Sequence, residues 1–399
     1  KITKKFPKLK GKTYSLIKIN DILDDINDIA LTKQYEFINA SLSEEILGDK
    51  INFRINISES EKFYIEKINI RGNFTTLEEV IRNNLIVDEG DPFNEILFNK
   101  SVNDIQSLGL FKKVETEINE GSNSSLKEID LKIEERPTGE ISLTAGFGTT
   151  GETLGGGIRE NNFLGRGIRL DTNLELTPDS IKGKFIYSKP NFNYSDNTLF
   201  TAIKSSTSDF MTDSGYKTSE IGFSLGTRFE QFQNIFLSPE LDFLIEDLET
   251  SSKASSTLKK QEGSYTDLYF NYSINQDLRD KKFRTEDGYV TTFSQELPII
   301  SDNAEFSNAF EVTKYKKLSP TSSMVGKISF FGKTVTGLND DVRISKRLNI
   351  PSSRLRGFQS GKVGPIENND YIGGNHLSSL NLSATLPNIV QGLDNLDVG

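Results

Sequence analysis

The chain has 399 residues, a net charge of −10 and no cysteine. The negative charge argues against a nucleic-acid-binding surface, and the missing cysteine excludes disulfides and thiolate metal sites. No stretch approaches about 18 consecutive apolar residues, so a membrane-spanning helix is not expected.

Residues 1–60 are expected to hold the second half of a small α+β domain. Apolar residues recur at helical spacing between residues 13 and 35. Two strand-like runs follow at residues 36–42 and 51–57, and the second alternates apolar with polar residues. No signal peptide is present at Lys1, so an exported protein with this sequence would be a fragment of a longer chain.

A complete α+β domain is predicted for residues 61–136. The run 63–70 predicts a strand, and a turn at Arg71–Asn73 leads into a helix. Thr75 or Thr76 is the expected N-cap of this helix, which reaches about Leu85.

The second half of this domain is predicted to contain one helix and two strands. A helix is expected to begin with Pro92 at its first position and to stop at Gly109. Strands at 111–118 and 127–134 complete a β-α-α-β-β order. The predicted core and turn residues are Ile68, Gly72, Asn73, Val80, Leu85, Ile105, Leu108, Gly109, Phe111 and Val114.

From residue 137 to residue 399 the pattern changes to long alternating runs, such as Ile221, Phe223 and Leu225 with small or polar residues between them. The 27 Phe and 12 Tyr accompany an apolar share of only 35%. Charges on one face of a strand require water and apolar side chains on the other require lipid or a core, so an antiparallel up-and-down transmembrane β-barrel satisfies both. A soluble β-sandwich is the alternative, but it needs turns every 8–12 residues or so, and several runs here are longer.

The barrel is expected to be incomplete. At about 20 residues for a strand and its connection, residues 139–386 hold about twelve strands, and the chain ends within a thirteenth. Lipid cannot satisfy an unpaired strand edge. We therefore expect the natural protein to continue beyond Gly399.

A basic, glycine-rich stretch lies between the eleventh and twelfth predicted strands. Its motif residues are Arg354, Leu355, Arg356, Gly357, Phe358, Gly364 and Pro365. The stretch resembles the (V/L)RGF motif in the long inward-folded loop of the BamA-type outer-membrane protein assembly factors, and Gly373–Asn375 resemble the start of the family's next strand. The 61–136 domain likewise resembles a POTRA (polypeptide-transport-associated) domain, and residues 161–167 resemble the family's first periplasmic turn.

The resemblance implies the architecture and the location. Residues 1–60 would be the C-terminal part of one POTRA domain and 61–136 a complete one, while 137–399 would be the N-terminal three quarters of a barrel, about 12 of roughly sixteen strands. The implied location is the outer membrane of a Gram-negative bacterium, with the POTRA domains in the periplasm. The implied partners are unfolded outer-membrane proteins, periplasmic chaperones, accessory assembly lipoproteins and outer-membrane lipid.

The implied activity is the insertion of β-barrel proteins into the outer membrane without ATP, after the POTRA domains have received them. A physical route is available at the first barrel strand, which would form a seam with the last strand. Its seam residues are Ile141, Leu143, Ala145, Gly146, Phe147 and Gly148. A short strand interrupted by glycines makes a weak seam, and an opened seam can template an incoming strand by β-augmentation.

Within the loop motif, the resemblance predicts that Arg356 points into the barrel lumen and meets an acceptor on the next two strands. Asn381 faces inward on the twelfth strand but has no charge, whereas the family often has Glu there. Asp397 matches the family's Asp-x-Gly on the thirteenth strand. The ion pair is therefore assigned mainly to Asp397, with Asn381 in support.

Enzymatic chemistry is not expected. Gly146–Gly151 fit G-x-G-x-x-G, but another alternating run follows instead of a helix, so the dinucleotide interpretation fails. The single His376 excludes His-dependent triads and multi-His metal sites, and no cofactor or metal is expected. The alternatives that remain are a polypeptide secretion transporter or a TamA-like assembly factor with the same fold, and a passive porin-like channel.

Overall fold

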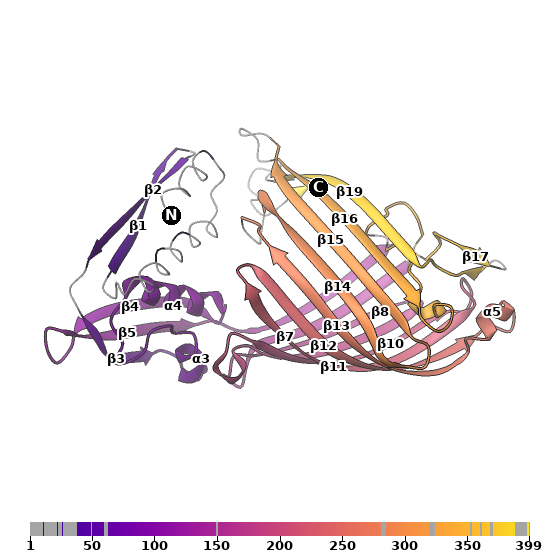
Figure 1. Ribbon diagram of the computed structural model, residues 1–399, viewed down its shortest axis with the longest axis horizontal. Coiled ribbons are helices and arrows are strands. Elements are labelled where there is room, and N and C mark those ends of the chain that lie inside the picture. The colour runs from indigo at the N-terminus through magenta and orange to yellow at the C-terminus, as the bar shows by residue number, and fades with distance from the viewer. Residues whose placement is uncertain are drawn as a thin grey trace. The chain divides into compact units, whose positions relative to one another are not determined.

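The computed structural model describes most of the chain beyond residue 37. The described residues are 38–48, 50–59, 63–148, 151–280, 285–318, 324–351, 353–359, 361–367, 370–387 and 397–398, with Gly11, Ile22 and Ile26. These residues form two units (Figure 1), of which the first is 1–139 with 161–168 and the second is 140–160 with 169–399.

The first unit begins with an antiparallel hairpin of β1 (Ile38–Leu47) and β2 (Lys50–Glu59). Both strands are longer than the sequence predicted, because Gly48, at a φ of 63°, turns the chain tightly between them. The helix predicted between residues 13 and 35 lies outside the described residues, apart from Ile22 and Ile26, which are helical and buried.

The β-α-α-β-β order follows in the same unit. Its elements are β3 (Tyr64–Arg71), α3 (Glu78–Arg82), α4 (Glu95–Ser107), β4 (Phe111–Glu120) and β5 (Leu126–Glu135). The sheet order is β3-β5-β4, with β5 parallel to β3 and antiparallel to β4. β5 is therefore the central strand of this sheet, and β3 and β4 are its two edge strands.

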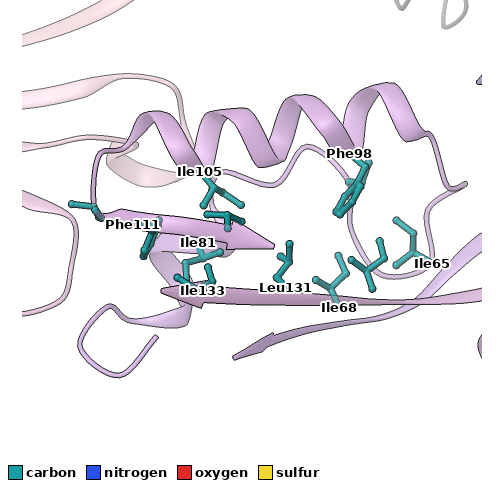
Figure 2. Close-up of a cluster of buried hydrophobic side chains, with 12 residues drawn as sticks. Ile65, Ile68, Ile81, Phe98, Ile105, Phe111, Leu131 and Ile133 are labelled. Atoms are coloured by element: carbon teal, nitrogen blue, oxygen red, sulfur yellow. The ribbon is translucent and has the colours of Figure 1, made fainter. Parts of the chain in front are cut away.

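An apolar core lies between this sheet and the helices (Figure 2). Ile68, Ile105, Phe111 and Val114 are buried in it, and Val80, Leu85 and Leu108 are half-buried and pack against it. A register shift between Ile65 and Lys67 lets Ile65 and Ile68, three residues apart, both be buried. Each fully buried side chain of this size contributes about 1.5–3 kcal/mol.

Both helices begin differently from the prediction. α3 starts at Glu78 with Leu77 at the N-cap and no capping side chain, and it ends at Arg82, before Leu85. Thr76 does not cap it, because its hydroxyl accepts a hydrogen bond from Asn162 Nδ2 at 2.9 Å. α4 starts three residues later than expected, because Asn94 Oδ1 accepts the backbone N–H of Leu97 at 3.2 Å and so acts as the cap.

The second unit is one sheet of 13 strands, counted over the described residues. Strands from β8 to β20 each pair antiparallel with the next in the sheet, in the order β20-β19-β16-β15-β14-β13-β12-β11-β10-β9-β8-β7-β6. Figure 1 shows the long strands lying side by side in a curved sheet. The strands are β6 (Gly139–Gly148), β7 (Gly151–Phe163), β8 (Ile168–Thr177), β9 (Ser180–Lys189), β10 (Thr198–Phe210), β11 (Tyr216–Phe232), β12 (Ile235–Thr250), β13 (Gly263–Asp277), β14 (Asp287–Ser301), β15 (Glu305–Lys317), β16 (Val325–Gly337), β19 (His376–Pro387) and the two-residue β20 (Asp397–Val398).

The faces of this sheet have the reverse of a soluble protein's polarity. On β11, Ile221, Phe223 and Leu225 are exposed, whereas Gly222, Ser224 and Gly226 between them are buried or close against neighbours. On β19, Leu380 and Leu382 are exposed as predicted. An exposed apolar face on a long antiparallel sheet is the pattern of a lipid-facing barrel wall. Among the described residues, no helix is long and apolar enough to cross a membrane.

Candidate functional site at the inner face of the sheet

The site is a long connection that returns to the face opposite the exposed apolar one. Residues 338–375, here called the inner loop, join β16 to β19, the eleventh and twelfth strands of the sheet, where the sequence placed the basic motif. The inner loop contains η3 (Ile344–Lys346), β17 (Ile366–Glu367) and β18 (Asp370–Tyr371), and β17 is labelled at one end of the strands in Figure 1.

The inner loop has two arms, here defined as residues 338–348, which contain Arg343, and residues 349–375, which contain Arg354. The two arms are joined near β19. Leu348 and Gly374 exchange backbone hydrogen bonds of 2.7 and 2.9 Å. Gly373 has a φ of 67°, and a Cβ there would lie 3.1 Å from the Leu348 carbonyl oxygen, so glycine is required at this turn. These two hydrogen bonds therefore close the segment between Leu348 and Gly374 into a loop with a fixed base.

A buried arginine attaches the first arm to the sheet. Arg343 is fully buried, and its guanidinium lies 3.2 Å from Glu246 Oε2, 2.6 Å from Asp267 Oδ2 and 3.1 Å from Glu305 Oε2. Its backbone N–H also donates to Glu305 Oε1 at 2.9 Å. These four residues, here called the Arg343 cluster, join the inner loop to β12, β13 and β15.

Two tyrosines complete the surroundings of this guanidinium. It stacks over the Tyr265 ring with 4.4 Å between Cζ and the ring centroid, and Nη2 donates to the Tyr269 hydroxyl at 3.4 Å. A planar, five-donor guanidinium can bond several carboxylates at once, which an ammonium cannot do with fixed geometry. The Arg343 cluster therefore fixes the orientation of the loop as well as its attachment.

An apolar cluster covers the strand ends next to Arg343. Ile344, the following residue, is buried with Tyr216, Leu248, Ala254 and Leu258. Leu258 belongs to the short helix α5 (Ser256–Lys259) in the β12–β13 connection. Low-polarity surroundings strengthen the attraction between the charges and raise the cost of leaving any of them unpaired.

The second arm contacts the sheet through Arg354. Its Nη2 lies 3.1 Å from Glu311 Oε1 on β15, and its guanidinium carbon lies 3.9 Å from the centroid of the Phe331 ring. Asn381 Nδ2 donates to the Arg354 backbone oxygen at 2.8 Å. Arg354 is only partly buried, with 21% of its side chain exposed, so this contact is wetter than the Arg343 cluster.

For Arg356 the structure gives the exposure of the side chain and the bonding partner of Asn381. This side chain is exposed, and the inward-facing Asn381 bonds to Arg354 and not to Arg356. Gly357, the residue after Arg356, has a φ of 84°. Asp397 lies in β20 opposite Pro387, but its side chain is outside what the structure describes, so the Arg356–Asp397 pair stays a prediction.

The other residues of the motif differ in their exposure to solvent. Leu355 is half-buried and Phe358 is exposed. Gly364 has a φ of 129° and open space around it, and the oxygen of the following Pro365 accepts the backbone N–H of Ile372 at 3.1 Å. Outside the motif, Lys362 pairs with Asp213 of the β10–β11 connection at 3.0 Å.

The predicted seam strand is β6, and it ends the sheet. Its only neighbour in the described part of the chain is β7. Ile141, Leu143 and Phe147 are exposed, as is the whole run 141–147 that includes Ala145 and Gly146. A Cβ on Gly146 would meet open space, so this glycine is not required by packing. Gly148 is the last residue of the strand.

The predicted turn residues of the first unit lie at close backbone approaches. A Cβ on Gly72 would lie 2.1 Å from the Ile133 carbonyl oxygen, so this position requires glycine. The side chain of Asn73 donates to the Thr76 backbone oxygen at 3.0 Å. Gly109 ends α4 with a φ of 70°.

A carboxylate organises the same turn. Burial would raise the pKa of Glu135, but hydrogen bonds from Thr76 and Thr75 outweigh it and lower the pKa below the usual range. The backbone N–H groups of Thr76 and Thr75 donate to its two oxygens at 2.7 and 2.9 Å. The charged form of Glu135 therefore stabilises the turn between β3 and α3.

Sequence reasoning missed the Arg343 cluster. The signal was present, because Glu246 and Asp267 fall on the face of β12 and β13 opposite to the exposed apolar residues Ile245 and Phe270. A charged side chain on this face is either hydrated or paired with an opposite charge. Which of the two holds depends on strand register between elements about 100 residues apart, which a single sequence does not supply.

The exposed apolar face of the long antiparallel sheet defines a class of protein: an outer-membrane β-barrel protein, here with an α+β domain before the barrel. A family model described as the Omp85 superfamily domain matches residues 162–396, and one described as the surface antigen variable number repeat, POTRA, matches residues 63–136. The chain belongs to the Omp85 superfamily, because the first match covers more than half of it. It is an outer-membrane chain with its POTRA domain in the periplasm.

Two curated relatives are outer membrane protein assembly factors named BamA. The one from Neorickettsia risticii (strain Illinois) is 24% identical over 314 residues, which are 75% of this chain and 41% of the relative. The one from Nitratidesulfovibrio vulgaris is 22% identical over 315 residues, which are 77% of this chain and 39% of the relative. The chain thus spans about two fifths of the length of these relatives.

Solved structures share the fold. BamA from Haemophilus ducreyi, lacking POTRA domains 1–3, matches with a TM-score of 0.71 at 19% identity, over 99% of this chain and 82% of that chain. CdiB from Escherichia coli matches with a TM-score of 0.57 at 15% identity, over 94% of this chain and 70% of that chain.

Proposed function

We propose that the protein that carries this chain assembles β-barrel proteins into the outer membrane, without ATP. Unfolded outer-membrane proteins are its clients: the POTRA domain receives them at a free sheet edge, and β6 templates an incoming strand. Both steps are strand additions, in which backbone hydrogen bonds supply the affinity and alternate side chains the register.

The observation that carries the proposal is the position of β6 at the end of the sheet. As the first strand of the sheet, with β7 as its one neighbour in the described part of the chain, β6 is the strand along whose other edge the strand that completes the barrel would pair. In lipid the backbone N–H and C=O groups along that edge must be satisfied by another strand. Pairing with a client strand satisfies them as well as pairing with the chain's own last strand would, so the exchange needs no external energy source.

The inner loop supports assembly over passive conduction. It binds to the inner face of the sheet through Arg343 and Arg354, which is more structure than a simple pore needs. The BamA relatives, named as assembly factors, favour the same function. Periplasmic chaperones and accessory lipoproteins are the partners proposed to deliver clients.

The second candidate is a polypeptide secretion transporter or a TamA-like factor with narrower clients. The fold shared with CdiB fits a relative of different activity. The two candidates differ in where the client goes, because an assembly factor leaves it in the membrane and a transporter releases it on the far side.

The test uses the protein in its full natural length, reconstituted in liposomes without nucleotide. We expect urea-diluted barrel proteins to fold into these vesicles at least about tenfold faster than into empty ones, as followed by heat-modifiable migration. Protease-protected client inside the vesicles but outside the membrane would favour the transporter. Ion leakage with no faster insertion would contradict assembly and favour a porin-like channel.

A matched control isolates the role of the β6 edge. Proline at Leu143 removes one backbone donor from β6, whereas alanine at Leu143 leaves every donor in place. We expect the proline variant to slow insertion and the alanine variant to insert clients at the rate of the unchanged protein.

A further inference from the structure

One row of side chains on the exposed apolar face of the second unit includes a lysine. Lys314 on β15 lies opposite Tyr289 on β14 and opposite Ile328 on β16, and Ile328 lies opposite Leu382 on β19. These four strands lie side by side in the sheet (Figure 1). Directly opposite residues of an antiparallel sheet point to the same face. Ile328 and Leu382 are 52% and 71% exposed, so Lys314 shares the lipid-facing side of the sheet with them.

This row lies at a limit of the apolar band. On β14, Tyr289 precedes Ile300, which is 65% exposed, by eleven residues. A register shift next to Leu268 keeps Ile300 on the same face as Tyr289. Eleven residues at about 3.4 Å each and a tilt of about 45° correspond to roughly 26 Å of membrane depth, and the apolar band of such barrels is about 25 Å tall with aromatic girdles at both limits. With Ile300 at one limit, Tyr289 and the row of Lys314 lie at the other.

The limit that contains Lys314 is the periplasmic one. The turn before β8, residues 161–168, belongs to the same compact unit as the POTRA domain, so β8 begins on the periplasmic side. The strands from β8 to β15 pair antiparallel in chain order, and β15 is the eighth of them. β15 therefore runs toward the periplasm, and Lys314 and Lys316 lie near its periplasmic end.

The positive charge of this row is not neutralised by the protein. Lys314 is exposed and forms no ion pair within the part of the chain that the structure describes. Lys316, two residues further toward the periplasm, has Asp287 at 3.8 Å and keeps 68% of its side chain exposed. A lysine with apolar neighbours on a lipid-facing surface extends its ammonium group to the headgroup level, where phosphate groups accept its hydrogen bonds.

We propose that Lys314 and Lys316 form a binding site for the phosphate group of an anionic phospholipid in the periplasmic leaflet. The next row toward the membrane centre, where the acyl chains would lie, is Val312, Phe330 and Leu380, of which Phe330 and Leu380 are 39% and 64% exposed. This continuity selects lipid as the occupant. A client strand does not fit, because β15 is already paired with β14 and β16 and has no free edge. The site goes beyond the proposed assembly function and does not depend on it.

The test uses a single indole in the same row, because residues 1–399 contain no tryptophan. Ile328→Trp places it next to Lys314, at a position whose 52% exposure leaves room for it. Any tryptophan outside residues 1–399 is first replaced by phenylalanine. The full-length protein is reconstituted in phosphatidylcholine vesicles that contain a minor share of either phosphatidylglycerol or phosphatidylcholine brominated on the acyl chains. The quenching by the two brominated lipids gives their relative binding constant at this position.

We expect phosphatidylglycerol to bind beside Ile328→Trp about fivefold more tightly than phosphatidylcholine, since one lysine near a membrane surface supplies a preference of this size. Lys314→Gln should lower the preference to below about twofold, and Lys316→Gln should lower it less, because Lys316 already has Asp287 nearby. Lys327→Gln is the matched control and should leave it unchanged. Lys327 lies next to Ile328 but on the opposite face, 5.9 Å from the centroid of the Tyr315 ring, and its replacement removes the same charge.

Four outcomes would overturn the proposal. Equal quenching by the two lipids would mean that the row does not select an anionic headgroup, and no quenching by either would mean that the row does not contact lipid. A preference that Lys314→Gln leaves unchanged, or that Lys327→Gln lowers as much, would reflect the overall charge of the protein. The same preference at Ile203→Trp, between Phe185 and Phe223 on the same face, would show that no local site exists. Heat-modifiable migration establishes that each variant is folded before the measurement.

Discussion

The two arms of the inner loop use the same chemistry at different depths. Arg343 is fully buried and meets three carboxylates, whereas Arg354 is 21% exposed and meets one, Glu311, which is itself 40% exposed. The arm with the recognisable sequence motif is the one with the weaker attachment. A motif therefore identifies the loop, while burial decides which residue holds it.

The physical difference between the arms lies in what remains after one partner is removed. Without Arg343, three buried carboxylates would face one another with no cation, and a buried unpaired charge costs several kcal/mol or so. Without Arg354, Glu311 can turn toward water. The first arm is accordingly expected to be the structural anchor, and the second is free to change its contacts.

The largest effect is expected for Arg343→Ala, which should lower the stability of the folded protein by about 3–5 kcal/mol. Urea titration in detergent micelles, read by heat-modifiable migration, measures it. The control replaces the whole Arg343 cluster by neutral residues, with Arg343→Met, Glu246→Gln, Asp267→Asn and Glu305→Gln together. This variant should recover most of the loss, and a loss as large as that of Arg343→Ala alone would show that charge pairing is not the cause.

Two apolar residues of the POTRA domain test whether the depth of burial determines how much stability a truncation costs. Ile105 is fully buried on α4, and Leu108, the residue after the end of α4, is half-buried. Ile105→Ala should cost about 3 kcal/mol and Leu108→Ala about half of that, because truncation costs rise with the cavity left behind. Urea unfolding of residues 63–136, followed by circular dichroism, gives both values. Equal costs would mean that burial does not rank these sites.

For the second arm we expect a smaller effect. Arg354→Ala should cost about 1 kcal/mol, from a partly exposed ion pair and a cation–π contact with Phe331. A double-mutant cycle with Glu311→Ala isolates the ion pair, and its coupling should be below about 1 kcal/mol. Coupling as large as the loss from Arg343→Ala would remove the distinction between the two arms.

The smallest effect is expected at Arg356, because its side chain is exposed. Arg356→Ala should change stability by less than about 0.5 kcal/mol, and its effect should add to that of Asp397→Ala. A non-additive result of more than about 1 kcal/mol would instead establish the Arg356–Asp397 pair expected from the sequence, and Arg356 would join Arg343 as an anchor.

The alternating patterns predicted much of the fold, because a strand with lipid on one face constrains every second residue. Ile221, Phe223 and Leu225 were assigned to the outer face from the sequence, and the structure exposes them. The position of the inner loop between the eleventh and twelfth strands also agrees with the prediction. Both features are local, so a single sequence contains enough information for them.

Features that depend on distant partners could not be predicted in the same way. The hydroxyl of Thr76 would cap α3 by local rules, but Asn162, which is 86 residues away, binds it instead. α4 begins three residues after Pro92, with Asn94 as its cap, because Pro92 forms an isolated β-bridge with Tyr64. The Arg343 cluster brings together residues up to 97 positions apart. In each case a tertiary contact overrides a local preference.

The most direct test of the account is to locate the client strand at the edge of β6. The chain has no cysteine, so single cysteines at Ser142 and Thr144 provide defined reporters once any cysteine outside residues 1–399 is removed. A client stalled during insertion, with single cysteines along one strand, is oxidised with each reporter. Strand templating predicts a disulfide at one client position for each reporter, and a shift of two client positions between Ser142 and Thr144. Disulfides of equal yield at all client positions, or at none while insertion proceeds at its full rate, would contradict templating at β6.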